Sequence, residues 1–499
     1  MANLKSLAKE TAIYGMSSIV GRFLNYLLVP LYTAKLSAAS GGYGVITNVY
    51  ALTALMLVLL TYGMETGFFR FANKENESPA RVYSTILISV GFTSLLFVGL
   101  VLTNLDSVAG ILGYADHPEY IGIMAAVVAL DAFQSIPFAW LRYKQRALKF
   151  AGLKLLFIVM NIGLNLLYFV VLPSLYEKHP EYIGNFYNPL VGVGYAFGIN
   201  LVCTASITVL FWSELTGFRY VFDFRLWKRI LKYSLPILIL GLVGILNQTI
   251  DKIIFPFVYD GSETEARSQL GIYGAASKIA MIMAMLIQAF RYAYEPFVFG
   301  KSKDKDNRST YALGMKYFVI FSQMAFLAVM LYMDLLRYII APAYWEGLRV
   351  VPIVMVAEIF MGIYFNLSFW YKLTDQTHYG ALFSLAGCIV IVALNTLLVP
   401  IYGYMACAWA GVAGYGICML LSYFIGQHKY PIHYPLRSIF RYTSLTIILY
   451  IFSTLIPTEW DIFLRLGINT LLMGLFVSYT IRNDFPLNQL PIIGKWFRK

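Results

Sequence analysis

Apolar residues follow one another in long runs along this chain, and only short polar breaks separate the runs. Each run has about the length, roughly 20 residues, that an α-helix needs to cross a bilayer. Barrel strands would be shorter and would alternate apolar and polar side chains, so the pattern favours helices. We therefore expect fourteen membrane spans, at residues 12–34, 43–69, 82–102, 120–140, 153–172, 190–212, 235–258, 273–297, 311–333, 350–370, 379–401, 404–425, 439–456 and 462–481.

The composition agrees with this pattern. Hydrophobic residues make up 59% of the 499 residues and charged residues only 13%, which is typical of a membrane protein. The spans leave almost no chain for a sizeable soluble domain. The predicted fold class is an all-α polytopic membrane protein.

The basic residues predict the orientation of the spans. Of the 38 Lys and Arg residues, 28 lie on one side of the predicted spans and six on the other. The positive-inside rule then places both termini in the cytoplasm, which requires an even number of spans. Topology and attraction to anionic lipid head groups explain the net charge of +12, so no nucleic-acid partner is expected.

Part of the sequence repeats at a separation of 230 residues. The dipeptide Tyr-Gly opens the second span at Tyr43 and the eighth at Tyr273, and at the same offset Glu65 matches Glu295. A repeat of six spans keeps its orientation, so we expect two parallel lobes with a cavity between them. The predicted domains are an N-terminal lobe at 1–222, a C-terminal lobe at 223–428 and a final helix pair at 429–499.

Charged residues inside the spans need compensation, because a charge at the centre of a membrane helix costs about 2.5–3.5 kcal/mol. The cations Arg22, Lys252 and Lys278 outnumber the single acid Asp251. We infer a cationic cavity for an anionic, phosphate-bearing substrate, lined by Arg22, Asn25, Asn247, Gln248, Lys252 and Lys278. In the alternative interpretation, Asp251 neutralises a lysine and the other cations reach the membrane interface.

Other polar positions allow more than one role. Asp131 in the fourth span and Glu358 in the tenth suit either hydrogen bonds between helices or ligand contact, and with Asp251 they are candidates for ion coupling or charge balance. Near the cytoplasmic span ends, Glu65 and Glu295 are expected to pair with Arg70 or Arg291 or to form a gate with them.

Signatures of enzymatic chemistry are missing from the sequence. "GKS" at residues 300–302 lacks the glycine that a nucleotide-binding loop needs five residues earlier, where Glu295 stands. None of the five histidines forms a metal-binding pair. We expect a protein that is not an enzyme and has no cofactor.

The span organisation, the cationic first and seventh spans and the stretch "YGVITNVYALTALMLVLLTYGMETGFFRF" at residues 43–71 resemble the polysaccharide flippases of the multidrug/oligosaccharidyl-lipid/polysaccharide exporter (MOP) superfamily. The arginine-rich first span of the related lipid II flippases is not matched here. The drug-extruding branch of the superfamily usually has twelve helices.

The resemblance implies a Wzx-type flippase in the bacterial inner membrane, which moves undecaprenyl-pyrophosphate-linked oligosaccharide units of O-antigen, lipopolysaccharide or capsule by alternating access. Arg22, Lys252 and Lys278 would hold the pyrophosphate. The implied partners are this glycan, membrane lipids, a proton or sodium ion, and a polysaccharide polymerase. Two alternatives stay open: a cation-coupled drug antiporter, and a membrane-embedded glycan polymerase or ligase, which would need a large periplasmic loop.

Overall fold

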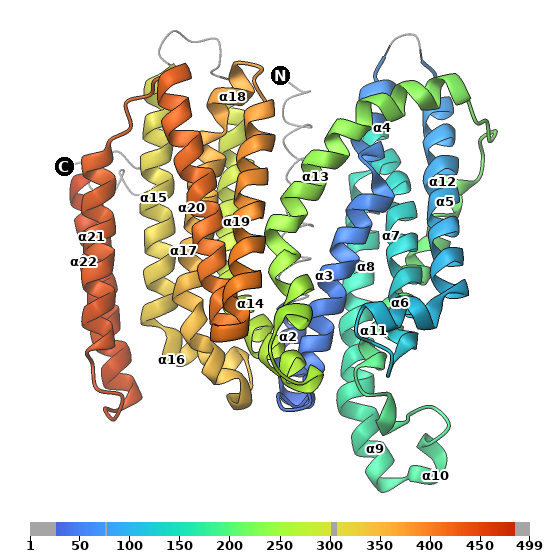
Figure 1. The fold of residues 1–499 in the computed structure, drawn as a ribbon, viewed down its shortest axis with the longest axis horizontal. Helices are drawn as coiled ribbons and strands as arrows, with labels where there is room; N and C mark the ends of the chain where they lie inside the picture. The colour runs from blue at the N-terminus through green and yellow to red at the C-terminus, as the bar shows by residue number, and fades with distance from the viewer. Residues whose placement is uncertain (1–25, 75–76, 301–306, 485–499) are drawn as a thin grey trace. The chain divides into compact units, whose positions relative to one another are not determined.

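The structure of the chain is a computed structural model that describes residues 26–74, 77–300 and 307–484. Within these ranges the chain forms helices and no strand, as Figure 1 shows, which confirms the predicted all-α class. Eleven of its helices are long and apolar enough to cross a membrane. The first predicted span lies mostly outside the described residues, the sixth corresponds to the shorter helix Gly194–Leu210, and the thirteenth corresponds to the helix Leu436–Thr454, which is not among the eleven.

The chain packs into two compact units. Unit 1 holds the described residues up to Ala275 together with Ile391–Cys407, and unit 2 holds Ala276–Val390 and the described residues from Ala408 onward. These units are defined by packing, whereas the lobes and final helix pair were inferred from sequence similarity and topology. The predicted three-domain division stays a prediction.

The long helical runs of unit 1 alternate in direction along the chain (Figure 1). They are α2 (Leu28–Lys35), α3 (Gly42–Thr61), α4 (Met64–Ala72), α5 (Pro79–Thr103), α6 (Leu105–Ile111), α7 (Pro118–Tyr143), α8 (Ala147–Leu166), the π-helix η1 (Leu167–Val171), α9 (Leu172–Lys178), α10 (Pro180–Ile183), η2 (Pro189–Val191), α11 (Gly194–Leu210), α12 (Trp212–Leu215) and α13 (Phe224–Val258).

Helix starts and breaks follow local chemistry. Proline at the first position begins α5 and α7, where its missing N–H is not needed. The Asp223 side chain accepts a hydrogen bond from the Leu226 N–H and so caps α13. The second span was predicted as one run, but Tyr62 and Gly63 have left-handed backbone conformations that separate α3 from α4.

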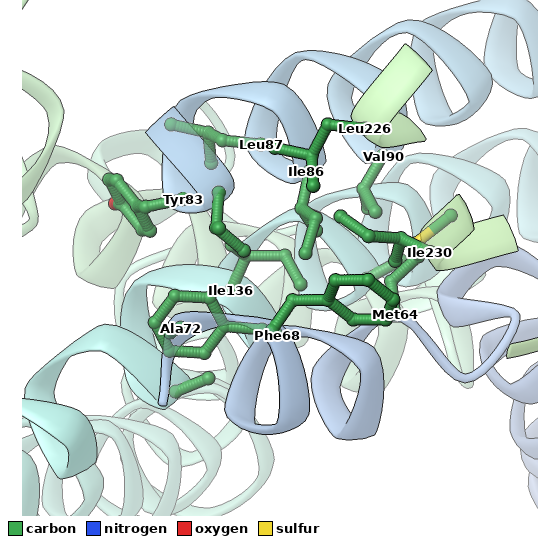
Figure 2. Close-up of a cluster of buried hydrophobic side chains, with 14 residues drawn as sticks. Met64, Phe68, Ala72, Tyr83, Ile86, Leu87, Val90, Ile136, Leu226 and Ile230 are labelled. Carbon is green, nitrogen blue, oxygen red and sulfur yellow. The ribbon is translucent and has the colours of Figure 1, made fainter. Parts of the chain in front are cut away.

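A cluster of large side chains forms the core at one end of unit 1. Figure 2 shows Met64 and Phe68 of α4 packed against Ile86 of α5, Ile136 of α7 and Ile230 of α13, and all five are fully buried. The Arg70 guanidinium lies beside this cluster, 4.1 Å from the centre of a ring on α13. Four helices are therefore fixed to one another here by shape complementarity.

Unit 2 contains the rest of α14 (Glu263–Gly300), which begins in unit 1. It also contains α15 (Asn307–Leu331), α16 (Met333–Leu336), η3 (Arg337–Ile339), η4 (Pro342–Val350), α17 (Val351–Leu367), α18 (Phe369–Leu373), α19 (His378–Tyr402) up to residue 390, α20 (Tyr404–Lys429) from residue 408, α21 (Leu436–Thr454) and α22 (Ile462–Asn483). Helix α15 packs against α17, α21 and α22.

The last helix, α22, is tied to α15 at one end, and to the end of α15 and the adjoining α16 at the other. An ion pair links Lys316 of α15 to Asp484 at the end of α22. At the opposite end, Arg465 of α22 pairs with Asp334 at 2.8 Å, and the Asn469 side chain donates a hydrogen bond to the carbonyl of residue 331 at 2.8 Å. The final helix pair, α21 and α22, is thus an integral part of unit 2.

Candidate functional site

The acid and the lysine inside α13 form an ion pair. The Lys252 ammonium donates hydrogen bonds to both carboxylate oxygens of Asp251, at 3.0 and 2.9 Å, and to the carbonyl oxygen of Gln248 at 3.2 Å. The Tyr273 hydroxyl of α14 donates to Asp251 at 2.7 Å. The Asp251 side chain is 11% exposed and the Lys252 side chain 23%. This pairing matches the alternative interpretation of the sequence, because the charge of Lys252 is balanced by an acid on its own helix.

Asn48 of α3 joins this pair to the rest of unit 1. Its side-chain N–H donates to the carbonyl oxygen of Lys252 at 2.7 Å, and its side-chain oxygen accepts from the Tyr114 hydroxyl at 2.8 Å. Only 2% of Asn48 is exposed. The sequence prediction did not include Asn48, although an asparagine one helical turn after Gly44, inside a predicted span, was a usable signal.

Each of the repeated Tyr-Gly dipeptides lies where its helix packs on the helix of the other. A β-carbon built on Gly44 of α3 would lie 1.8 Å from the carbonyl oxygen of Arg267 on α14, and one on Gly271 would lie 2.9 Å from the backbone nitrogen of Gly44. A β-carbon on Gly274 would lie 2.3 Å from the Thr47 hydroxyl. Helices α3 and α14 therefore cross with their backbones in contact, which only glycine allows.

An arginine fastens this crossing to the loop before α7. The Arg267 guanidinium donates hydrogen bonds to both carboxylate oxygens of Asp116, at 2.8 and 3.1 Å, and to the carbonyl oxygen of Gly113 at 2.7 Å. Its carbon lies 5.3 Å from the centre of the Tyr114 ring. The hydrogen bond from Arg267 holds the pKa of the Asp116 carboxyl below its ordinary value.

The predicted gate residues have different partners from those expected. Glu65 pairs with Arg142 of α7 rather than with Arg70. Arg70 lies over the Tyr233 ring, and in unit 2 Arg291 lies 4.8 Å from the centre of the Phe365 ring. The expected Glu65–Arg70 pair is therefore wrong, because Arg142 approaches Glu65 from a helix distant in sequence. The Glu295 side chain lies outside the described residues, and a gating role stays a prediction.

The remaining predicted site residues lie on several helices. Arg22 and Asn25 fall outside the described residues. The Asn247 side chain donates to the carbonyl oxygen of Val243 at 3.0 Å, and Gln248 is exposed on α13. Lys278 on α14 and Glu358 on α17 are half-buried in unit 2. Their binding and coupling roles stay predictions.

Asp131 of α7 belongs to a second polar group in unit 1. It lies within electrostatic range of Lys154 of α8 and close to Thr204 of α11. The neighbouring Gln134 side chain donates to the carbonyl oxygen of Thr204 at 2.7 Å. Hydrogen bonds between helices thus account for Gln134. Asp131 has a cation within its electrostatic range.

Long apolar helices, charges paired inside them and a glycine-packed helix crossing define the class as a multi-pass membrane protein. The structure is similar to "Lipid II flippase MurJ, inward closed conformation", with a TM-score of 0.73 and 14% identity, over 95% of this chain and 99% of that one. It is also similar to an inward-facing multidrug resistance MATE family transporter of the MOP superfamily, with a TM-score of 0.65 and 14% identity, over 84% of this chain and 95% of that one. The MATE multidrug transporter DinF-BH is similar as well, with a TM-score of 0.58 and 17% identity, over 88% of this chain and 96% of that one.

A family model described as "Polysaccharide biosynthesis protein" matches residues 7–296 of the chain. The chain belongs to this family, and its fold is that of the MOP superfamily, as the sequence resemblance indicated. No curated protein sequence matches the chain.

Proposed function

We propose that this protein moves undecaprenyl-pyrophosphate-linked oligosaccharide units of surface polysaccharide from the cytoplasmic to the periplasmic leaflet of a bacterial inner membrane. The observation that carries the proposal is the match to the polysaccharide biosynthesis family, which includes α13, the helix that contains Asp251 and Lys252. In this proposal both termini are cytoplasmic, and the end of unit 1 that holds Arg267 is periplasmic.

The extent of the structural similarity supports a flippase over a drug transporter. The lipid II flippase structure covers 95% of this chain, whereas the two multidrug transporters cover 84% and 88%. Ion pairs join α22 to α15 at one end and to Asp334 of α16 at the other, and α21 packs against α15, so the final helix pair belongs to the working transporter. A lipid-linked substrate needs a path for its tail that a soluble drug does not need.

The charges suit a substrate that carries a pyrophosphate group. Arg22, Lys252 and Lys278 would bind its oxygens, since ammonium and guanidinium groups are strong phosphate ligands. Lys252 is held by Asp251 through two hydrogen bonds. In our proposal the pyrophosphate draws Lys252 away, and Asp251 then takes up a proton or a sodium ion. Asp131 and Glu358 are further candidates for coupling or charge balance.

Alternating access needs a contact that opens and closes. Helix α14 belongs to unit 1 up to Ala275 and to unit 2 beyond it, so it would carry movement from one unit to the other. Its glycine contact with α3 would separate in the opposite conformation. We keep the predicted lobes, 1–222 and 223–428, as the moving bodies of this proposal and 429–499 as an addition to the second lobe.

A cation-coupled drug antiporter is the second candidate, because the similar structures include multidrug transporters. The two functions differ in what Lys252 does. A pyrophosphate substrate needs its positive charge, whereas a cationic drug would be repelled by it. A glycan polymerase or ligase is less well supported, since the family and the fold are those of transporters.

Three variants at the ion pair test the proposal in cells that lack the native gene. Lys252→Arg keeps the charge and should retain appreciable polysaccharide export, whereas Lys252→Met should lose most of it. The double variant Asp251→Asn/Lys252→Met removes both charges, so it should accumulate normally and still fail to export. Surface polysaccharide and the amount of protein are measured together.

Each outcome of this test supports one interpretation. Export by the double variant would mean that the ion pair is only structural, and full export by Lys252→Met would remove the cation from the mechanism. If Lys252→Met exports fully, resistance of the same cells to drugs would favour the antiporter. Arg22→Lys and Arg22→Met should follow the same order as the Lys252 variants.

A further inference from the structure

The connection between α8 and α11 extends far from the other helices of unit 1. Helices α8, η1 and α9 form a continuous apolar run at Ala147–Lys178, which has 32 residues. At about 1.5 Å per residue this run is about 48 Å long, whereas the hydrocarbon core is about 30 Å thick. Figure 1 shows α9 and α10 extending past the neighbouring ends of α6 and α11. The segment from α9 to η2 is here called the extension.

Tyrosine rings hold the extension to the start of α11. The Tyr187 ring stacks on the Tyr195 ring, with centroids 5.4 Å apart and an interplanar angle of 12°. The centroid of the Tyr168 ring lies 4.9 Å from that of the Tyr195 ring. The Tyr195 hydroxyl accepts a hydrogen bond from the Asn188 N–H at 2.7 Å and donates one to the Asn188 carbonyl at 3.2 Å. The loop is therefore fixed by specific contacts.

This fixed loop presents apolar side chains outward. Tyr182 is 76% exposed, Phe186 is 73% exposed and Leu190 is 87% exposed, all within nine residues. Exposed apolar side chains face lipid along membrane spans, but on a structured segment beyond the hydrocarbon core such a cluster indicates contact with a partner. Most of each ring faces outward, so these faces are accessible to such a partner.

The polar residues of the extension indicate the chemistry of the partner. Glu177, Glu181 and Asn185 are exposed and lie close to Tyr182 and Phe186 in the sequence, and Lys178 is the one lysine of the extension. Anionic lipid surfaces and nucleic acids are bound by clusters of Lys and Arg, which this segment does not have. Planar carboxylates and amides next to aromatic rings are instead suited to a ligand that carries hydroxyl groups on adjacent carbon atoms.

We propose that the extension is a docking site for an uncharged oligosaccharide, which receives the sugar part of the substrate after it has crossed the membrane. The C–H face of a pyranose ring is weakly positive and packs on the negative face of an aromatic ring. Tyr182 and Phe186 supply such faces, and Glu181 and Asn185 accept hydrogen bonds from the sugar hydroxyls. That the sugar reaches the extension only after crossing the membrane rests on the proposed function, which places the extension on the periplasmic side.

The test measures sugar binding by the whole protein in lipid nanodiscs. The probe is the oligosaccharide that mild acid releases from the lipid-linked pool of the source cells, observed by saturation-transfer NMR. Tyr182→Ala/Phe186→Ala should weaken its binding by about tenfold. Phe463→Ala is the matched control, because it removes a ring that is 80% exposed at the start of α22 and should leave binding unchanged.

Two results would overturn the docking site. The first is equal binding by the wild type and the double variant. The second is strong quenching of Phe186→Trp fluorescence by brominated lipids, which would show that this ring lies in the bilayer as an anchor. The proposed function is checked separately by flipping of the intact lipid-linked molecule. Flipping without sugar binding would refute the docking site alone, and sugar binding without flipping would refute the proposed function alone.

Discussion

Unit 1 is held together by different means at its two ends. Where α3 crosses α14, the backbones touch at Gly44, and polar side chains link α3 to α13 and α14 to the loop before α7. At the end shown in Figure 2, Phe68 and its neighbours fill the space between four helices with large side chains. The contact at Gly44 contains no large side chain from that residue, so a joint movement of the helices can separate it, whereas opening the aromatic cluster would expose large buried rings. The first end is suited to opening during transport, and the second is suited to remain closed within the unit.

The largest effect is expected from a side chain placed in the helix crossing. Gly44→Val puts a β-carbon 1.8 Å from the Arg267 carbonyl oxygen, so α3 and α14 have to separate. We expect a loss of stability above about 4 kcal/mol, seen as failure to accumulate in folded form. Gly99→Val is the control, because no atom lies within 4 Å of its β-carbon. Similar accumulation of both variants would show that the crossing is not tightly packed.

A cavity in the aromatic cluster should have the next largest effect. Phe68→Ala removes a fully buried ring and should cost about 3 kcal/mol, measured as lower thermal stability in detergent. Phe92→Ala is the matched control, because the Phe92 ring is 67% exposed and should affect stability little. Equal losses would mean that the cluster does not stabilise this end of the unit.

Loss of the hydrogen bonds of Asn48 should have a smaller effect. Asn48→Leu leaves the Tyr114 hydroxyl and the Lys252 carbonyl without their partner, at a cost of about 1–3 kcal/mol. Adding Tyr114→Phe removes one of the two orphaned groups. The double variant should therefore be less destabilised than the sum of the two single variants. Simple additivity in thermal unfolding would contradict this coupling.

The smallest expected effect is a dependence of stability on pH at Asp116. Arg267 lowers the pKa of this carboxyl in the folded protein, so its stabilising contribution is present at neutral pH and is lost as the pH falls below about 4. Asp116 is 48% exposed, which limits the contribution to within about 1 kcal/mol. The melting temperatures of the wild type and Asp116→Asn should therefore converge in acid. A constant difference from neutral to acid pH would exclude titration of Asp116 as the cause.

The sequence predicted the helical class because hydrocarbon leaves the backbone no partner other than its own helix. It also identified the two Tyr-Gly dipeptides as a repeat, and these dipeptides turn out to contact each other's helices. The extension was not predicted, because hydropathy placed the end of the fifth span at residue 172 and carries no information on a helix that continues beyond a span.

Partners distant in sequence were the harder part of the site. Glu65 was expected to pair with the nearby Arg70, but Arg142 reaches it from α7. The environment of Lys252 depends on Asn48 and Tyr273, which belong to two other helices. Helical periodicity shows which residues share a face, whereas the helix that packs on that face is set by tertiary structure.

Transport by the purified protein tests the central claim most directly. The protein is reconstituted into vesicles that contain the undecaprenyl-pyrophosphate-linked oligosaccharide, and an enzyme added outside measures how much glycan is accessible. Our account predicts that vesicles with the wild type expose the inner-leaflet glycan, whereas vesicles with Lys252→Met expose only the outer-leaflet fraction. Unchanged accessibility in wild-type vesicles, together with exchange of a cationic drug against protons or sodium, would contradict it.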